Sequence, residues 1–214
     1  MKVPTRGEVR LAWLFFSLEE RRSGMDLFTA MKERRSCRNF LPGSIDEATI
    51  EKILEAGTWA PSPLNSQPWD FIVVTNKEVK EKIFSEGERC RTWALEKSGW
   101  KWLGSYPLDF LRSAPVIIAV VGDPKKSGVD MFTEEGPMGY QAACAAAIQN
   151  IHLAAYALGL SSLWFTLFDK KAIREILGIV PEKTPLALIC LGKPGSSLAP
   201  TPRKEVKEKT TYIR

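Results

Sequence analysis

Apolar positions recur along the chain with both strand and helix spacing, which predicts a mixed architecture. The continuous apolar run at 116–122 predicts a strand that is buried on both faces. Three further strands are predicted at 69–75, 161–168 and 185–191. Helices are predicted at 25–35, 44–60, 77–96, 139–158 and 170–177. Because the elements mix without a steady β-α-β alternation, the pattern indicates the α+β class.

Two details of these helices follow from side-chain chemistry. Ser44 and Glu47 have the spacing of a capping box, in which Ser44 caps the first amides and Glu47 reaches back to the start of the helix. In the helix that opens at residue 25, the apolar spacing predicts side chains that turn toward the core. These are Leu27, Phe28 and Met31.

Residues 1–24 differ in composition from the rest of the chain and are interpreted as an N-terminal extension, which leaves 25–214 as one folded domain. The extension is basic, and its apolar residues have helical spacing, so it is expected to form a helix that docks on the domain. No apolar run reaches the ~18–20 residues that cross a bilayer, and no signal-peptide cleavage site follows the longest one. Together with four scattered cysteines, this predicts a cytoplasmic protein with reduced thiols.

The chain has a single histidine, His152, within an alanine-rich stretch. One histidine excludes a multi-histidine metal site, and we predict no metal and no catalytic side chain. We interpret His152 as a packed helix residue, because a lone histidine in such a stretch is more often structural than catalytic. Any reaction is therefore expected to depend on a cofactor.

Positive charge is concentrated at the two ends of the chain, whose formal net charge is +5. Residues 1–40 carry nine lysines and arginines against five acids, residues 193–214 carry six against two, and the body carries fifteen against eighteen. One interpretation is that both ends converge on a compact anion such as a phosphate. A solvated surface is the alternative for the lysine-rich tail, and nucleic acid is the least favoured, because no aromatic residues are interleaved with the basic ones.

The first candidate motif is the segment Arg34-Arg35-Ser36-Cys37-Arg38 at the end of the first helix. Guanidinium groups bind phosphate through two parallel hydrogen bonds and stay charged at neutral pH. The chain has neither G-x-G-x-x-G after a strand nor a Walker loop, so side chains would have to grip any nucleotide phosphate. Arginines at a helix C-terminus also satisfy the helix dipole, and that alternative stays open.

The second candidate motif lies about 25 residues downstream, at 60–69. Prolines stiffen this loop, which displays one hydroxyl and two carboxamides that each donate and accept hydrogen bonds. The residues are Pro61, Ser62, Asn65 and Gln67. Such a set suits the hydroxyls of a polyol or the edge of a heterocycle.

The two motifs together resemble the N-terminal signature of the FMN-dependent nitroreductase family. Later segments agree with it, namely Gln149-Asn150, the strand that bears Trp164, Gly192-Lys193-Pro194 and Pro202-Arg203-Lys204. The resemblance implies a nitroreductase-like fold with a mostly antiparallel central sheet flanked by helices. It also implies a homodimer with an extended C-terminal arm and two FMN sites at the interface.

The resemblance also assigns the motif residues to the cofactor. One subunit would supply Arg34, Arg35, Ser36 and Arg38, and the other would supply Pro61, Ser62, Asn65 and Gln67. Arg203 would return from the arm to the phosphate, and a backbone amide between Leu163 and Thr166 would face flavin N5. Lys193 and Thr166 depart from the residues usual in the family.

The activity that the resemblance implies is hydride transfer from NADH or NADPH, through flavin N5, to a nitroaromatic, a quinone or a similar small acceptor in a ping-pong scheme. Two alternatives stay open: a flavin-binding sensor or store without substantial turnover, and another reaction on the same fold, such as reductive dehalogenation or flavin destruction. The aromatic-rich segment 89–110 is expected to be either a lid over the flavin or ordinary packing. Neither nucleic acid nor a membrane is expected as a partner.

Overall fold

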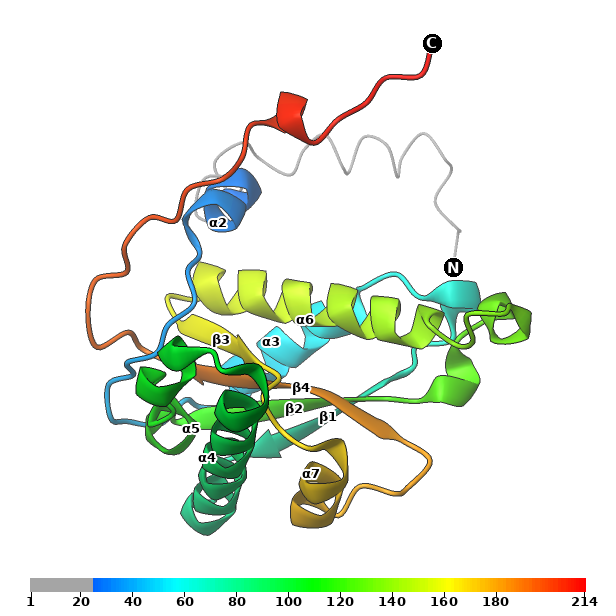
Figure 1. The fold of residues 1–214 in the computed structure, drawn as a ribbon. Coiled ribbons are helices and arrows are strands. Elements are labelled where there is room, and N and C mark those ends of the chain that lie inside the picture. The colour runs from blue at the N-terminus through cyan, green and yellow to red at the C-terminus, as the bar shows by residue number, and fades with distance from the viewer. Residues whose placement is uncertain (1–24) are drawn as a thin grey trace, which may run out of the picture.

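The computed structural model describes residues 25–214, and a four-stranded antiparallel sheet lies at the centre of the fold (Figure 1). The strands are β1 (Trp69–Val74), β2 (Val116–Gly122), β3 (Ser161–Phe165) and β4 (Thr184–Gly192), and they pair in the order β1-β2-β4-β3. The predicted α+β class with an antiparallel sheet is confirmed. The prediction of a docked helix before residue 25 lies outside the described residues.

Both faces of the sheet are covered, which explains the continuous apolar runs of its central strands. Helices α3 (Glu47–Thr58) and α6 (Gly139–Ala157) cover one face, and α4 (Lys77–Ser98), α5 (Phe110–Ser113) and α7 (Lys170–Leu177) cover the other (Figure 1). Successive strand residues point to opposite faces. Ile118 and Ile189 therefore join the core under α6, and Ile117 and Leu188 join the core against α4 and α7. All seven residues of β2 are buried, as predicted.

Helix α3 begins through a different residue from the one predicted. Its N-cap is Asp46, whose carboxylate accepts hydrogen bonds from the backbone amide and the hydroxyl of Thr49, each at 2.8 Å. The predicted capping box of Ser44 and Glu47 is wrong, because Glu47 is the first helical residue and Ser44 lies two positions before the cap. An aspartate caps as well as a serine does, so the two could not be separated by spacing alone.

Helix α2 (Leu27–Glu33) presents its apolar side chains outward, against the prediction. Leu27, Phe28 and Met31 are exposed, Phe28 at 77%, and only Ala30 of this helix is buried. Among the described elements, α2 packs mainly against α6, and this contact leaves its apolar side chains exposed. The described part of one chain therefore leaves an apolar helix face open at its surface.

Short elements complete the fold. They are the 3-10 helices η2 (Pro63–Asn65), η3 (Lys101–Ser105), η4 (Pro124–Lys126), η5 (Val129–Phe132) and η6 (Val206–Glu208). Strand β3 ends at Phe165, three residues earlier than predicted. After β4 the chain leaves as an extended arm that runs past α2 (Figure 1), and every residue from 201 to 214 is exposed. Within residues 25–214, no helix combines the length and apolar character needed to cross a bilayer.

Candidate functional site

Helix α6 sets the distance between the two predicted motifs. Its 19 residues extend about 28 Å at 1.5 Å per residue. Near its C-terminal end, the Tyr156 hydroxyl donates a hydrogen bond to the Glu33 carboxylate of α2 at 3.2 Å. At its N-terminal end, Gly139 lies against Pro63 of η2. The arginine motif that follows α2 and the loop that holds η2 are therefore at opposite ends of one helix (Figure 1).

Arg34 is half-buried beside two other guanidinium groups. Burial is the main cause that lowers its pKa below the usual value, and the charges of Arg35 and Arg203 lower it further. Arg203 belongs to the C-terminal arm, so the arm returns to the start of the domain at this point. None of the ion pairs formed within residues 25–214 involves these three arginines. The cluster has the charge and hydrogen-bond donors of an anion site.

Arg35 partly fulfils the alternative role suggested for the motif, in which an arginine satisfies the C-terminal end of a helix. Its Nη1 donates to the carbonyl oxygens of Lys32 and Arg34, each at 2.7 Å, and so satisfies the C-terminal end of α2. Its Nε is buried and has no hydrogen-bond partner within the described chain. A buried donor without a partner is costly, and a ligand oxygen beside it would remove that cost.

Ser36 and Arg38 follow along the edge of the sheet. Ser36 forms an isolated parallel bridge with Ser162 of β3, and the next amide, that of Cys37, donates to the Ser162 carbonyl at 3.0 Å. This pairing holds the arginine motif beside β3. Arg38 is exposed, and its Nε donates to the Tyr106 hydroxyl at 3.2 Å, which brings the motif to the aromatic-rich segment.

The loop at 61–67 has an unusual backbone. Leu64, Asn65 and Gln67 have positive φ angles of 53°, 53° and 44°, in the left-handed region that side-chain-bearing residues rarely adopt. Two hydrogen bonds brace the loop: the Gln67 amide donates to Ser62 Oγ at 3.0 Å, and Gln67 Nε2 donates to Asn65 Oδ1 at 3.3 Å. Such strain persists only where the surroundings hold it, and it is frequent at ligand sites.

The surroundings of this loop provide that support. The Ser66 hydroxyl donates to the Lys126 carbonyl of η4 at 2.8 Å. Gly128 has φ of +89°, and a Cβ there would lie 2.6 Å from Pro63 Cβ. A Cβ at Gly139 would lie 2.3 Å from the Ser127 carbonyl oxygen. The close approach of these backbones requires glycine at both positions.

The structure thus gathers the predicted site residues into two groups and does not join them within one chain. Arg34, Arg35, Ser36, Arg38 and Arg203 belong to the group at the α2 side. Pro61, Ser62, Asn65 and Gln67 belong to the loop beside the start of α6. Each group is partly exposed and has hydrogen-bonding atoms that face solvent.

His152 lies between these groups on α6 and is a packed residue, as predicted. It is 2% exposed, its Nδ1 lies 2.6 Å from Ser162 Oγ, and its ring stacks on Trp164 at 6.0 Å between centroids. Burial, together with the nearby charge of Arg34, lowers the pKa of His152 to about 3. The imidazole is therefore neutral at physiological pH, and it orients Trp164 without acting as a proton donor there.

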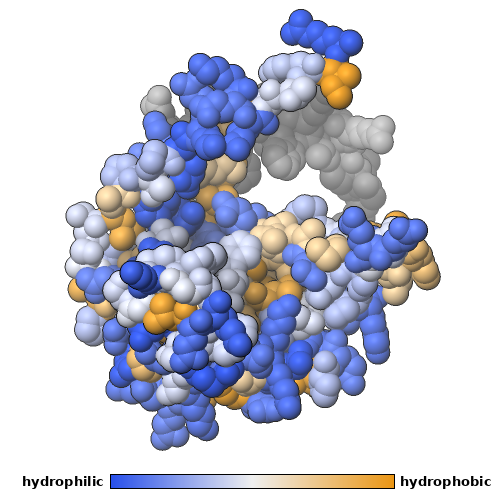
Figure 2. All heavy atoms as spheres, viewed as in Figure 1, coloured by the Kyte–Doolittle hydropathy of each residue, from blue (hydrophilic) through white to orange (hydrophobic). Residues whose placement is uncertain are grey.

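An aromatic hollow of about 260 Å³ opens beside the end of β3, and Trp164 forms part of its wall. Phe165 of β3 also lines it, and the other aromatic residues of its wall come from η3 and the residues that flank it, namely Trp100, Trp102 and Tyr106. Trp164 also borders a second hollow of about 390 Å³ over α6. Figure 2 shows hydrophobic residues gathered over α6 and just below it on this face.

Some aromatic residues of segment 89–110 belong to the core, and others are exposed as a lid would require. Phe110 is fully buried and packs edge to face against Phe165 at 5.5 Å, so it is a core residue. Trp93, Trp100 and Trp102 are 55–60% exposed, and Trp100 stacks on Trp102 at 6.1 Å. Exposed indoles beside a hollow are available to a ligand. These three tryptophans therefore agree better with a lid than with core packing.

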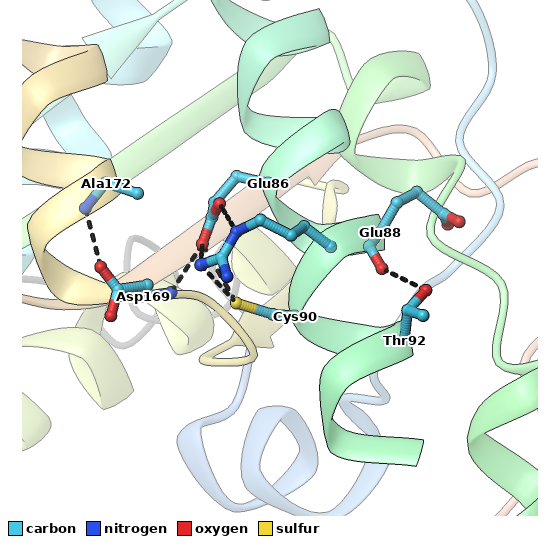
Figure 3. Close-up of polar contacts among 7 residues, drawn as sticks. Glu86, Glu88, Cys90, Thr92, Asp169 and Ala172 are labelled. Atoms are coloured by element: carbon cyan, nitrogen blue, oxygen red, sulfur yellow. Dashed lines mark hydrogen bonds and ion pairs between the residues drawn. The ribbon is translucent and has the colours of Figure 1, made fainter. Parts of the chain in front are cut away.

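A buried carboxylate near the same strand end was missed by the sequence analysis. Glu86 of α4 is 7% exposed, and it accepts hydrogen bonds from Arg89, from the Cys90 thiol and from the Asp169 amide (Figure 3). The last bond is 3.0 Å long and ties α4 to the turn between β3 and α7. The i, i+3 and i, i+4 spacing of the first two donors was a readable signal, but the third comes from 83 residues away.

Comparisons with known proteins agree with this fold. The family model described as "Nitroreductase family" matches residues 31–193. An Archaeoglobus fulgidus protein named "Putative NADH dehydrogenase/NAD(P)H nitroreductase" is 34% identical over 170 residues, which cover 75% of this chain and 81% of that protein. The 5,6-dimethylbenzimidazole synthase of Rhodospirillum rubrum is 30% identical over 177 residues, with coverage of 81% and 83%.

Among solved structures, oxidised iodotyrosine deiodinase bound to FMN and 3-iodo-L-tyrosine superposes with a TM-score of 0.72. It is 21% identical, with coverage of 88% of this chain and 98% of that one, so it supports the fold alone. The chain belongs to the Nitroreductase family, as its motifs predicted. It is accordingly an oxidoreductase.

Proposed function

We propose that the protein is an FMN-dependent oxidoreductase that acts as a homodimer and carries hydride from NADH or NADPH to a nitroaromatic, a quinone or a similar small acceptor. The observation that carries the proposal is that the C-terminal arm runs past α2 (Figure 1) and brings Arg203 near enough to the half-buried Arg34 for its charge to act there. Cations that lie near one another are stabilised by an anion between them, and the single phosphate of FMN meets that need.

The residues present fit this cofactor in two respects. The unpartnered Nε of Arg35 supplies a buried donor beside the guanidinium groups of the phosphate site. The strained loop displays the amides of Asn65 and Gln67 in a fixed, solvent-facing geometry, which suits the edge of a heterocycle. A loop held in this way binds without a further ordering cost, which favours affinity.

The separation of the two groups supports a site shared by two subunits. Within one chain they lie at opposite ends of α6, a helix that is about 28 Å long. A second copy related by twofold symmetry would bring the 61–67 loop of one subunit to the arginine group of the other, and would do so twice. The exposed apolar face of α2, with Phe28 at 77%, is a surface that such a contact would cover.

The chain itself provides binding and electrostatics, with no side chain assigned to proton transfer. FMN supplies, when bound, the site at N5 that accepts hydride from the nicotinamide and returns it to the acceptor. Arg38 carries a positive charge that would stabilise negative charge at the pyrimidine edge. His152 is neutral and buried, which agrees with a ping-pong reaction in which the protein orients its substrates.

The aromatic hollow beside β3 is the proposed acceptor site. Its walls of Trp100, Trp102 and Trp164 offer ring faces to a planar molecule, and the exposed indoles leave it open to solvent. The similarity to 5,6-dimethylbenzimidazole synthase favours one alternative on the same fold, in which flavin itself is consumed. A flavin-binding sensor without turnover is the remaining alternative.

The purified protein tests the proposal directly. We expect a yellow protein whose heat-released flavin runs as FMN on chromatography, and steady oxidation of NADH or NADPH when menadione or nitrofurazone is added. Reduction of the flavin without reoxidation by any acceptor would favour the sensor, and loss of flavin with formation of a benzimidazole would favour the synthase reaction. Bound FAD, or a colourless protein that does not take up FMN, contradicts the proposal.

We also propose a cytoplasmic location, supported by four buried, unbridged cysteines.

A further inference from the structure

Tyr106 joins the arginine motif to the wall of the aromatic hollow. Arg38 Nε donates to the Tyr106 hydroxyl at 3.2 Å, and the guanidinium carbon of Arg38 lies 5.5 Å from the centroid of the same ring. The Tyr106 ring also lines the hollow beside Trp102 and Trp164. One side chain therefore contacts a predicted cofactor residue and the proposed acceptor site.

Tyr106 is itself fixed from several directions. Its carbonyl accepts a hydrogen bond from Arg91 Nη1 at 2.9 Å, and Arg91 is paired with Glu88 on the same helix at 2.6 Å. Its ring packs edge to face with Trp102 at 5.7 Å and with the buried Phe110 at 6.3 Å. Tyr106 is thus held at its backbone by α4 and at its ring by Trp102 and by Phe110 of the core.

Arg38 has no comparable support of its own. The segment that carries it is exposed, and the bond to Tyr106 is the one side-chain hydrogen bond that Arg38 forms within the described residues. A free arginine side chain loses rotamer entropy when it is ordered. A hydroxyl together with a ring face removes part of that cost before a ligand binds.

We propose that Tyr106 is a positioning residue that orients the Arg38 guanidinium for the flavin site and couples that orientation to the acceptor hollow. The inference rests on the proposed function, because it takes Arg38 as a flavin contact. Since the ring of Tyr106 lines the hollow, a planar acceptor that packs on it also presses on the group that holds Arg38. Acceptor binding and the electrostatics at the flavin are therefore linked through one side chain.

The Tyr106→Phe variant tests this role, because it keeps the ring and removes only the hydroxyl. We expect the Kd for FMN to rise about three- to tenfold, as for the loss of one hydrogen bond to a charged group whose ring contact remains. We expect the midpoint potential of the bound flavin to become more negative, because a mobile Arg38 stabilises the reduced anion less well. The KM for menadione should stay close to its wild-type value, since the wall of the hollow stays in place.

A double-mutant cycle separates positioning from general packing. Arg38→Lys keeps the charge but loses the planar fork, and in combination with Tyr106→Phe its effect on FMN affinity should be clearly smaller than the sum of the two single effects. Tyr212→Phe, in the exposed end of the arm, is the matched control and should leave affinity and potential unchanged. Additive effects in the cycle would overturn the coupling.

A further measurement does not depend on flavin. The side-chain Nε–H resonance of Arg38 should be protected from solvent exchange in the wild-type protein and should lose that protection in Tyr106→Phe. If the wild-type protein does not bind FMN at all, the proposed function fails, and the role of Tyr106 fails with it. If the wild-type protein binds FMN and Tyr106→Phe matches it in affinity and potential, only the role of Tyr106 is overturned.

Discussion

Arg34 and Arg203 lie close enough for the charge of one to lower the pKa of the other, although they come from opposite ends of the described chain. Burial is the larger cause of the lowered pKa of Arg34, and the nearby Arg35 contributes as well. Like charges that a fold brings together destabilise it until a counter-ion arrives. The excess of basic residues at both ends of the sequence therefore places positive charge from both ends in one region of the fold.

The first prediction concerns this pair. Arg34→Gln and Arg203→Gln should each weaken FMN binding by about 1.5–3 kcal/mol, because each removes a charge-assisted hydrogen bond to phosphate. Quenching of flavin fluorescence during titration of the apoprotein measures the affinity. Arg214→Gln removes a charge from the same arm at a position where no flavin contact is predicted, and it should have little effect on FMN affinity. Equal affinities for all three variants would refute the phosphate assignment.

The second prediction uses the strain in the loop at 61–67. Leu64→Gly and Gln67→Gly each relieve a positive φ angle and should stabilise the apoprotein by up to about 1 kcal/mol, as judged by thermal or urea unfolding.

The two variants should differ in function. Gln67→Gly also removes a carboxamide that is predicted to line the flavin, so its FMN affinity should fall, whereas Leu64→Gly should keep the affinity of the wild-type protein. A drop in affinity of equal size in both variants would show that loop rigidity matters and that the Gln67 side chain does not.

The sequence predicted the centre of the sheet well because β2 has a strong local signature. Its seven apolar residues are buried on both faces, and its predicted bounds of 116–122 match the structure. The first motif was also predicted from local chemistry, since three arginines near one helix end imply an anion or a helix dipole, and Arg35 satisfies that dipole.

What the sequence could not reveal depends on residues far apart in the chain. The contact of Arg38 with Tyr106 spans 68 positions, and that of Glu86 with the Asp169 amide spans 83. The outward face of α2 was mispredicted for a related reason, because periodicity shows that a face is apolar but not whether its own chain covers it. Strain at Leu64 was likewise invisible, since leucine has no preference for a positive φ.

The third prediction concerns pH. The pKa of His152 is about 3 in the folded protein against an ordinary 6.5, so between these values the unfolded chain binds more protons. Stability is therefore complete above pH 6.5 and is lost as the pH falls toward 3. From pH 7 to pH 5 this one group should lower the free energy of unfolding by about 2 kcal/mol.

Urea unfolding of the wild-type protein and of His152→Gln at both pH values checks this prediction. The glutamine amide can still bond to the Ser162 hydroxyl, and it does not titrate. The wild-type protein should lose about 2 kcal/mol more than the variant does over this interval. Parallel losses in the two proteins would mean that His152 is protonated while folded.

The fourth prediction concerns the Glu86 network in Figure 3. Burial raises the pKa of Glu86, but hydrogen bonds from Arg89, Cys90 and the Asp169 amide outweigh it, so the pKa lies below its usual value. Glu86→Gln weakens this junction of α4 with the start of α7 and should cost about 1–2 kcal/mol in thermal unfolding.

Glu81→Gln is the matched control for that measurement. Glu81 is half-exposed and pairs with Arg112 at 3.6 Å, so its loss should change stability by less than ~0.5 kcal/mol. If both variants unfold like the wild-type protein, the buried carboxylate contributes nothing to the junction.

The last prediction tests whether each site is shared between subunits. An Arg34→Ala protein lacks one group of the proposed site, and a protein with both Asn65→Ala and Gln67→Ala lacks the other. In a mixed dimer, one site combines both lesions, and the second site combines an intact arginine group with an intact loop. Unfolding and refolding the two variants together, at an FMN concentration that saturates the wild-type protein but neither variant, should therefore restore FMN binding in up to half of the sites of the mixed dimers, as measured by bound flavin after size-exclusion chromatography. Refolding each protein alone is the control, and it should restore none. If the two groups instead served one site within a single chain, no mixture could recover binding, and the arrangement at the two ends of α6 would need another explanation.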